Sequence, residues 1–395
     1  MRKLSCKPVV VGTIGAGFAA HLHGDGYLRV CTVPVRLKMI ADPNLERAEA
    51  VREKYGYEQA VSDYRELLKD PEIDVIDILT PPFLHQSMIL ETLAAGKHVI
   101  CEKPLTGYFG QPGEANVGHT PKREMYAQVL RNLEQIRGAA EKSGKRVMYA
   151  ENYIYATPVQ RAAQLLRAKG SKILFMKGEE STPGSMTAGA GQWTSIGGGP
   201  LQRIGCHPLA GMLYLKQVEA ETRGETITVT SVLADTGVAT SCLSRDEKTY
   251  LAARPEDVED FGTLTLTFSD GTKALMIASD VVLGGTKNYI EVYGHDSTLI
   301  CNLTPTDLLS TYFCDENGIR QEQLAEMQKL KLGWTKAFVS DEVIRGYMDE
   351  LEDFMEAVSM DRQPLSTLEL AIHVTKILYA AYCSAEEDRR IFLIE

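Results

Sequence analysis

Short apolar runs, each followed by a turn and a helical pattern, alternate along the first 150 residues. Strand, turn and helix units of this length are typical of a parallel, doubly wound sheet with helices on its faces. The carboxyl ends of parallel strands meet at one edge of such a sheet, where ligands bind. We therefore expect the strand ends to converge on one site; they lie at Gly15, Asp42, Thr80 and Glu102.

Apolar and polar residues alternate in the second half of the chain, as in a sheet with one covered face. The expected strands are Lys172 to Gly178, Thr226 to Leu233, Gly262 to Phe268, Lys273 to Ile277 and Tyr289 to Tyr293. The turn at residues 269–272 joins two of them as a hairpin. Helices at residues 341–360 and 367–386 are expected to end the chain and to pack back. The chain is thus predicted to have an α/β domain at 1–150 and a mainly antiparallel α+β domain at 151–395.

Composition narrows the possible partners. A chain of 395 residues with a formal charge of −11 has no basic face for nucleic acid, and no apolar run approaches the length of a membrane span. The start of the chain lacks an apolar signal segment. The 8 cysteines include no close Cys-x-x-Cys pair, so we expect reduced thiols in a cytoplasmic protein.

The first apolar run, from Val9, leads into Gly15-Ala16-Gly17-Phe18-Ala19-Ala20. This G-x-G-x-x-A turn lets backbone approach a pyrophosphate at the start of the next helix, as in a Rossmann dinucleotide site. The second run ends at Asp42, whose carboxylate would accept hydrogen bonds from ribose hydroxyls and would repel a 2′-phosphate. NAD is therefore favoured over NADP. Alternatively, Asp42 caps the helix that follows Pro43.

The segment His98-Val-Ile-Cys-Glu-Lys-Pro-Leu105 ends another apolar run with a charged pair and a proline. A lysine held beside a rigid proline at this edge can reach a bound substrate. The proline's preceding bond is a candidate for the cis form. A solvated lysine on a surface loop is the alternative.

Together, the glycine turn, Thr80-Pro81-Pro82 with His85, and Glu102-Lys103-Pro104 resemble the Gfo/Idh/MocA oxidoreductases over nearly the whole chain. The resemblance implies a bound nicotinamide dinucleotide, Lys103 in contact with substrate or nicotinamide ribose, and a homo-oligomer, dimer or tetramer, formed through the second sheet. Asn152 and Tyr155 stand at the family's crossover, where they either face the cofactor or substrate or anchor the backbone. The residues assigned to cofactor binding are Gly15, Gly17, Phe18, Ala19, Asp42, Thr80, Pro81, His85, Glu102, Lys103 and Asn152.

Residues 106–125 form an insertion relative to that family pattern, since members usually enter the next helix at once. Its glycines and prolines predict a loop. The loop leaves directly from the Lys103 turn, so we expect a lid or a subunit contact, with a disordered surface segment as the alternative.

A glycine run at 197–199 leads to Arg203 and His207. The family pattern is Asp-x-Gly-x-His, and His207 matches its histidine, whereas Arg203 replaces its aspartate. Arg203 either lowers the pKa of His207 and Lys103 by repulsion, binds a substrate carboxylate, or marks altered chemistry. Upstream, Trp193 is either a wall for a sugar ring or a packed core residue.

These features predict an NAD-dependent oxidoreductase that acts on a sugar, cyclitol or sugar derivative. His207 is the expected proton acceptor and Lys103 polarises the same oxygen, with substrate contacts from Arg203, Tyr155 and Trp193; no metal is expected. One alternative is a redox-neutral enzyme in which transient oxidation permits glycosidic cleavage. Another is a non-catalytic NAD-binding regulator.

Overall fold

The computed structural model describes residues 7–187, 189–304, 309–314, 333–337 and 342–393. The chain forms two compact units, and each is assembled from separate stretches of sequence. The first unit contains Met1–Phe109, Arg123–Ala156 and Arg345–Lys376. The second contains Gly110–Lys122, Thr157–Ile344 and Ile377–Glu395.

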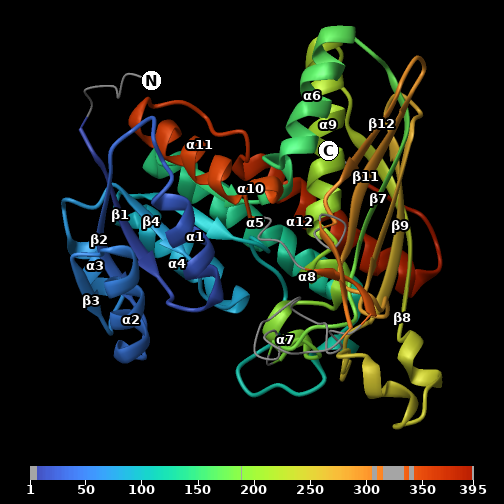
Figure 1. Cartoon of the computed structure of the whole chain (residues 1–395), viewed down its shortest axis with the longest axis horizontal. Helices are drawn as coiled ribbons and strands as arrows, with labels where there is room; N and C mark the ends of the chain where they lie inside the picture. The colour runs from blue at the N-terminus through green and yellow to red at the C-terminus, as the bar shows by residue number, and fades with distance from the viewer. Residues whose placement is uncertain (1–6, 188, 305–308, 315–332, 338–341, 394–395) are drawn as a thin grey trace. The chain divides into compact units, whose positions relative to one another are not determined.

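The first unit is built on a six-stranded sheet in the order β3-β2-β1-β4-β5-β6 (Figure 1). All of its neighbouring strands run parallel, which confirms the predicted doubly wound architecture. The strands are β1 (Val9–Ile14), β2 (Val35–Ala41), β3 (Gln59–Val61), β4 (Val75–Ile78), β5 (His98–Glu102) and β6 (Val147–Ala150).

Helices cover this sheet and make its central strands fully internal. Every residue of β1 and β4 is buried, because a parallel sheet carries helices on both faces. The register pairs Ile14 with Ala41 and with Ile78, so the strand ends lie at one edge as expected. The helices are α1 (Phe18–Tyr27), α2 (Leu45–Tyr55), α3 (Arg65–Lys69), α4 (Pro82–Ala94), α5 (Lys122–Ser143) and, packed against α1, α11 (Tyr347–Ser359).

The second unit contains a seven-stranded sheet in the order β12-β11-β7-β10-β9-β8-β15. Only the central pair β7 and β10 runs parallel among its neighbours, so the prediction of a mainly antiparallel sheet is confirmed. The strands are β7 (Ile173–Ser181), β8 (Val229–Gly237), β9 (Phe261–Phe268), β10 (Lys273–Ser279), β11 (Lys287–Gly294), β12 (Thr298–Asn302) and β15 (Ile391–Phe392). A separate pair consists of β13 (Leu309–Phe313) and β14 (Gly333–Ala337).

Two long helices, α6 (Thr157–Lys169) and α9 (Cys206–Arg223), lie side by side along this sheet (Figure 1). Glycine lets α9 approach closely, because a Cβ built at Gly178 of β7 would lie 3.0 Å from Pro208 Cβ. The covered face of β9 shows the predicted alternation: Leu264, Leu266 and Phe268 are buried and the residues between them are partly open. This alternation defines the core of the second unit.

Residues 110–122 of the insertion after the Lys103 turn belong to the second unit. Val117 and Gly118 are buried, and the Gly118 N–H donates to Asp257 Oδ2 at 2.9 Å. The Lys122 ammonium lies 4.8 Å from the ring centroid of Trp193. The alternative of a disordered surface segment therefore does not hold for Val117 to Lys122, and the lid or subunit role stays a prediction.

The predicted helix over 341–360 is two helices, α10 (Glu342–Arg345) and α11, separated by Gly346 in the left-handed conformation. Asp341 lies outside the described residues. The last helix, α12 (Leu368–Glu387), begins one residue after its predicted start. In the described parts of the chain, no helix is long and apolar enough to cross a membrane. Cys6 falls outside those parts, and none of the seven cysteines within them forms a disulfide.

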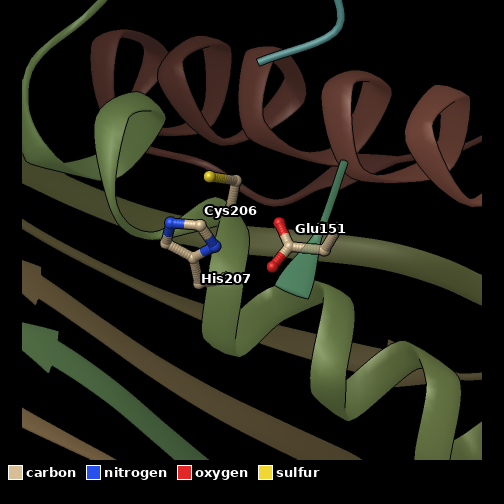
Figure 2. Close-up of side chains that lie close together, drawn as sticks. All are labelled: Glu151, Cys206 and His207. Carbon is tan, nitrogen blue, oxygen red and sulfur yellow. The ribbon is translucent and has the colours of Figure 1, made fainter. Parts of the chain in front are cut away.

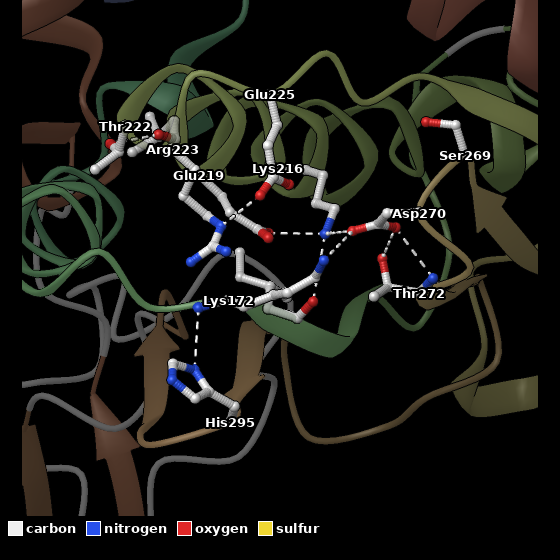
Figure 3. Close-up of polar contacts among 12 residues, drawn as sticks. Lys172, Lys216, Glu219, Thr222, Arg223, Glu225, Ser269, Asp270, Thr272 and His295 are labelled. Atoms are coloured by element: carbon white, nitrogen blue, oxygen red, sulfur yellow. Dashed lines mark hydrogen bonds and ion pairs between the residues drawn. The ribbon is translucent and has the colours of Figure 1, made fainter.

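A buried ion cluster holds α9 against the hairpin between β9 and β10 (Figure 3). The Lys216 ammonium donates to Glu219 at 2.7 Å and to Asp270 at 3.0 Å, and it also reaches the carbonyl of Ile173. Lys216 is only 2% exposed. Asp270 additionally accepts from Thr272, which shapes the predicted hairpin turn.

Replacing Lys216 by Met should therefore strongly destabilise the protein. The change leaves two acidic groups near each other without their central cation, and breaking a buried pair from one side costs about 3–5 kcal/mol. Urea unfolding measures the free energy. Gln217→Met, at the exposed neighbouring position on the same helix, should cost far less. Equal losses in the two variants would contradict this assignment.

Candidate functional site

The glycine turn after β1 has the geometry that a pyrophosphate requires. Gly15 adopts φ +102°, and a Cβ there would lie 2.6 Å from the Leu79 carbonyl oxygen. Gly17 caps α1 without a side-chain hydrogen bond, and no atom lies within 4 Å of its missing Cβ. The first turn of α1 therefore presents backbone N–H groups and a positive dipole end to open space.

Asp42 lies directly after β2, where its buried carboxylate braces the glycine turn. It accepts from Ala16 N at 2.9 Å, from Asn44 N at 2.9 Å and from Arg47 Nη2 at 2.7 Å. Burial opposes the charge, but these donors outweigh it and lower the pKa of Asp42. The capping alternative was wrong, because Asn44 caps α2 through its own side chain. The ribose role stays a prediction.

The turns after β4 and β5 are tied together by His85. This buried ring of α4 contacts the Thr80 carbonyl oxygen through Nε2 and the Pro104 carbonyl oxygen through Nδ1, both at 2.8 Å. Burial lowers the pKa of His85, and a neutral ring donates to only one of the two oxygens. His85 therefore acts on the site through these two turns. The Lys103–Pro104 bond is cis.

A buried network that the sequence analysis missed lies behind Lys103. His23 of α1 contacts Asp77 of β4 through Nδ1 at 2.9 Å and Glu102 of β5 through Nε2 at 3.4 Å. Glu102 Oε2 in turn accepts the backbone N–H of Lys103 at 2.9 Å. Burial opposes the imidazolium, yet the two carboxylates raise the pKa of His23 well above its usual value. A signal existed in the sequence, since Asp77 is a lone charge inside an apolar strand.

Asn152 and Tyr155, the predicted crossover residues, are buried just after β6. The Asn152 amide donates to the Arg345 carbonyl at 3.0 Å, and the Tyr155 hydroxyl donates to Asp353 at 2.6 Å. The Ser366 N–H donates back to the same hydroxyl. These contacts favour the anchoring alternative for both side chains.

The glycine run in the second unit is clamped by Glu259, which the sequence analysis also missed. The buried Glu259 carboxyl accepts from Gly199 N and Leu201 N, both at 3.0 Å, and from the Tyr382 hydroxyl at 2.9 Å. A Cβ at Gly199 would lie 2.0 Å from the Glu259 carbonyl oxygen, so this close approach requires glycine. The clamp sets the start of α8 (Pro200–Arg203), the short helix before α9.

His207 and Cys206 occupy the first turn of α9, and both are buried (Figure 2). Arg203, at the end of α8, forms an ion pair with Asp280. Asp280 lies one residue beyond β10 and also accepts from Thr182 Oγ1 at 3.0 Å. A carboxylate from the sheet thus offsets the charge of the arginine that precedes His207.

Trp193 begins the short helix α7 (Trp193–Ile196) and is 2% exposed. Its ring centroid lies 4.8 Å from that of Tyr382, and the backbone N–H of Trp193 donates to Asp257 Oδ1 at 2.7 Å. These contacts, together with Lys122 over the ring, favour the packed-core alternative.

The glycine turn, the open N-terminus of α1 and the acid after β2 fit a dinucleotide in the first unit, so the fold and turn define a Rossmann-type NAD-binding protein. The family model for the oxidoreductase NAD-binding Rossmann fold matches residues 9–117. The model for the family's C-terminal alpha/beta domain matches residues 181–393. The chain belongs to the Gfo/Idh/MocA oxidoreductase family.

Among named relatives, levoglucosan dehydrogenase of Pseudarthrobacter phenanthrenivorans is 27% identical over 79% of this chain and 78% of its own length. Myo-inositol 2-dehydrogenase of Thermotoga maritima is 23% identical over 98% of both chains. The fold is similar to that of a levoglucosan dehydrogenase solved with NADH and L-sorbose, with a TM-score of 0.73, 22% identity and coverage of 98% of this chain and 100% of that one.

Replacing Asp42 by Ala should weaken NAD binding about tenfold and narrow the preference for NAD over NADP. The variant loses the carboxylate expected to accept the ribose hydroxyls and releases Arg47, which can then pair with a 2′-phosphate. Fluorescence titration with both reduced cofactors measures the ratio. Glu46→Ala, at an exposed position in the first turn of α2, is the matched control. An unchanged ratio in Asp42→Ala would refute the assignment.

Glu259 should make stability fall with rising pH. Burial raises the pKa of Glu259 to about 7, whereas an unfolded glutamate titrates near 4.3. The folded state therefore holds this proton between about pH 4.3 and pH 7 while the unfolded state loses it, which removes about 4 kcal/mol across that window. Above pH 7 the contribution is constant.

Unfolding free energies of the wild type and Glu259→Gln, measured from pH 5 to pH 8, test this expectation. As pH rises, the unfolding free energy of the wild type should fall relative to that of Glu259→Gln. The two proteins share all other titratable groups, so their difference reports on Glu259 alone. Glu256→Gln, at an exposed position nearby, should show a constant difference. A constant difference for Glu259→Gln as well would show that Glu259 is ionised in both states.

Proposed function

We propose that the protein is an NAD-dependent dehydrogenase that oxidises one hydroxyl-bearing carbon of a sugar, cyclitol or sugar derivative. The relatives named for levoglucosan and myo-inositol support this substrate class. NAD supplies the hydride acceptor, and the chain's own residues bind, orient and move the hydroxyl proton.

The observation that carries the proposal is the ion pair between Arg203 and Asp280. An unpaired arginine at the position of the family's aspartate would repel a proton on His207. Asp280 offsets that charge and places a carboxylate beside the turn that leads into α9. Proton removal by His207 therefore remains compatible with the substitution.

The same ion pair weighs against Arg203 as the clamp for a substrate carboxylate. Its Nη2 already donates to Asp280, and this carboxylate neutralises the charge that would attract the carboxylate of a substrate. A neutral polyol is thus a better match for this position than a sugar acid.

We assign proton acceptance from the hydroxyl to His207 and polarisation of the same oxygen to Lys103. The support for Lys103 is the rigidity of its turn. The Glu102 carboxylate holds its backbone N–H and His85 contacts the Pro104 carbonyl, so the backbone below the ammonium is constrained from two sides.

Replacing Lys103 by Met should lower kcat by about 10²- to 10⁴-fold, the usual contribution of a positioned proton-transfer group. NAD affinity should remain within a few fold, because the backbone contacts are retained. Turnover is followed as reduced-nicotinamide absorbance with levoglucosan and myo-inositol, and cofactor affinity by fluorescence titration. Lys69→Met, an exposed lysine of the same unit, is the control. Undiminished turnover would remove Lys103 from the mechanism.

The same assay separates net oxidation from redox-neutral chemistry. Stoichiometric formation of reduced nicotinamide with a released keto sugar supports the dehydrogenase. Cleavage of a glycoside without accumulation of reduced cofactor would favour the alternative in which oxidation is transient.

A further inference from the structure

The covered face of the second unit's sheet changes from apolar to polar at one end. One cross-strand row consists of Met276, Gly178 and Ile290, on β10, β7 and β11. The next row toward that end consists of Ala278, Glu180 and Asn288. A face that packs on helices is normally apolar throughout, so two adjacent polar residues there require an explanation.

The described residues leave polar atoms of both side chains without hydrogen bonds. Asn288 is fully buried, and neither its amide nitrogen nor its amide oxygen has a hydrogen-bond partner among these residues. Glu180 is 6% exposed, and its Oε2 likewise has no hydrogen-bond partner in the described part of the chain. Buried polar groups in this state cost stability, which a purely structural role would not justify.

The neighbouring residue on the other face shows the contrast. Glu179, also buried, accepts from the Tyr289 hydroxyl at 2.8 Å and from Ser181, and it pairs with Lys287 at 2.9 Å. The fold thus satisfies one glutamate of β7 and leaves an oxygen of the next one unpaired.

The cross-strand row that contains Glu180 and Asn288 borders the start of α9, whose first turn carries His207. A Cβ at Gly205, the N-cap of α9, would lie 3.1 Å from Ala278 Cβ, the residue next to Glu180 across the strands. A Cβ at Gly178 would lie 3.0 Å from Pro208, the residue after His207. Asp280, two residues beyond Ala278, pairs with Arg203 at the same end. All these residues belong to the second unit.

We propose that Glu180 and Asn288 form a hydroxyl-recognition subsite for the polyol substrate. The glutamate oxygen accepts a hydroxyl proton, and the amide both donates and accepts, which suits neighbouring hydroxyls on one ring. The pair binds hydroxyls other than the one that reacts, and therefore selects the sugar. Buried polar groups built for hydroxyls reject analogues that lack them. This inference rests on the proposed dehydrogenase function.

The test compares Glu180→Gln and Asn288→Leu with the wild type on levoglucosan, myo-inositol and methyl β-D-glucoside. We expect KM for the accepted sugar to rise about tenfold or more in Asn288→Leu, with KM for NAD unchanged. Sugar binding to the NADH-loaded protein is measured in parallel by titration calorimetry. Glu179→Gln, on the opposite face of the same strand, is the matched control and should keep its KM for sugar.

Thermal unfolding separates recognition from structure. Because the fold leaves these groups unpaired, Asn288→Leu should not lower the Tm, whereas loss of a structural residue would. A lowered Tm together with an unchanged KM in both variants would overturn the subsite.

The outcomes distinguish the two proposals. If the wild type oxidises a sugar and both variants have the wild-type KM for that sugar, the subsite is refuted and the dehydrogenase proposal is supported. If the wild type binds a sugar without oxidising it and the variants lose that binding, the subsite is supported and the dehydrogenase proposal is refuted. If the wild type neither binds nor oxidises any of the three sugars, both are refuted.

Discussion

The Glu102 carboxylate connects three elements of the first unit, and the shape of the Lys103 turn depends on it. One of its oxygens faces His23 on α1, and the other accepts the Lys103 N–H. His23 in turn contacts Asp77 at the centre of β4, and Asp77 also accepts from the Tyr27 hydroxyl. Helix α1, which follows the glycine turn, and the turn that carries Lys103 are therefore positioned by one buried set of charges.

Another acid lies close to this network. Asp77 and Glu102 both contact His23, and Glu350 of α11 is buried near them. Burial raises the pKa of Glu350 well above its usual value, so its proton limits the excess of negative charge. Such an arrangement fixes the geometry of the Lys103 turn at a cost in stability.

In the second unit, two acids, Glu259 and Asp280, hold the backbone and the charge that precede α9. Glu259 holds the backbone of the glycine run, and Asp280 offsets Arg203 at the end of α8. Both acids come from segments distant in sequence from the residues they hold. Arg203 replaces the family's aspartate, but Asp280, just beyond β10, places a carboxylate next to it. The negative charge is therefore present in this region and comes from a different segment of the chain.

The sequence by itself determined the parallel first sheet, the mainly antiparallel second sheet and the glycine turn, because these follow from local periodicity and from residue types that only special backbone conformations require. It also singled out Lys103 and His207, whose motifs are local. It missed His23, Asp77, Glu259 and Asp280 as parts of the site, since their partners lie 20 or more residues away and only pairing across strands and helices brings them together. The tertiary structure alone decided that Asp42 braces the glycine turn while Asn44 caps the helix. It alone also showed that, among the described residues, Glu180 Oε2 and the Asn288 amide have no hydrogen-bond partner, because the hydrogen bonding of a buried polar group depends on its surroundings.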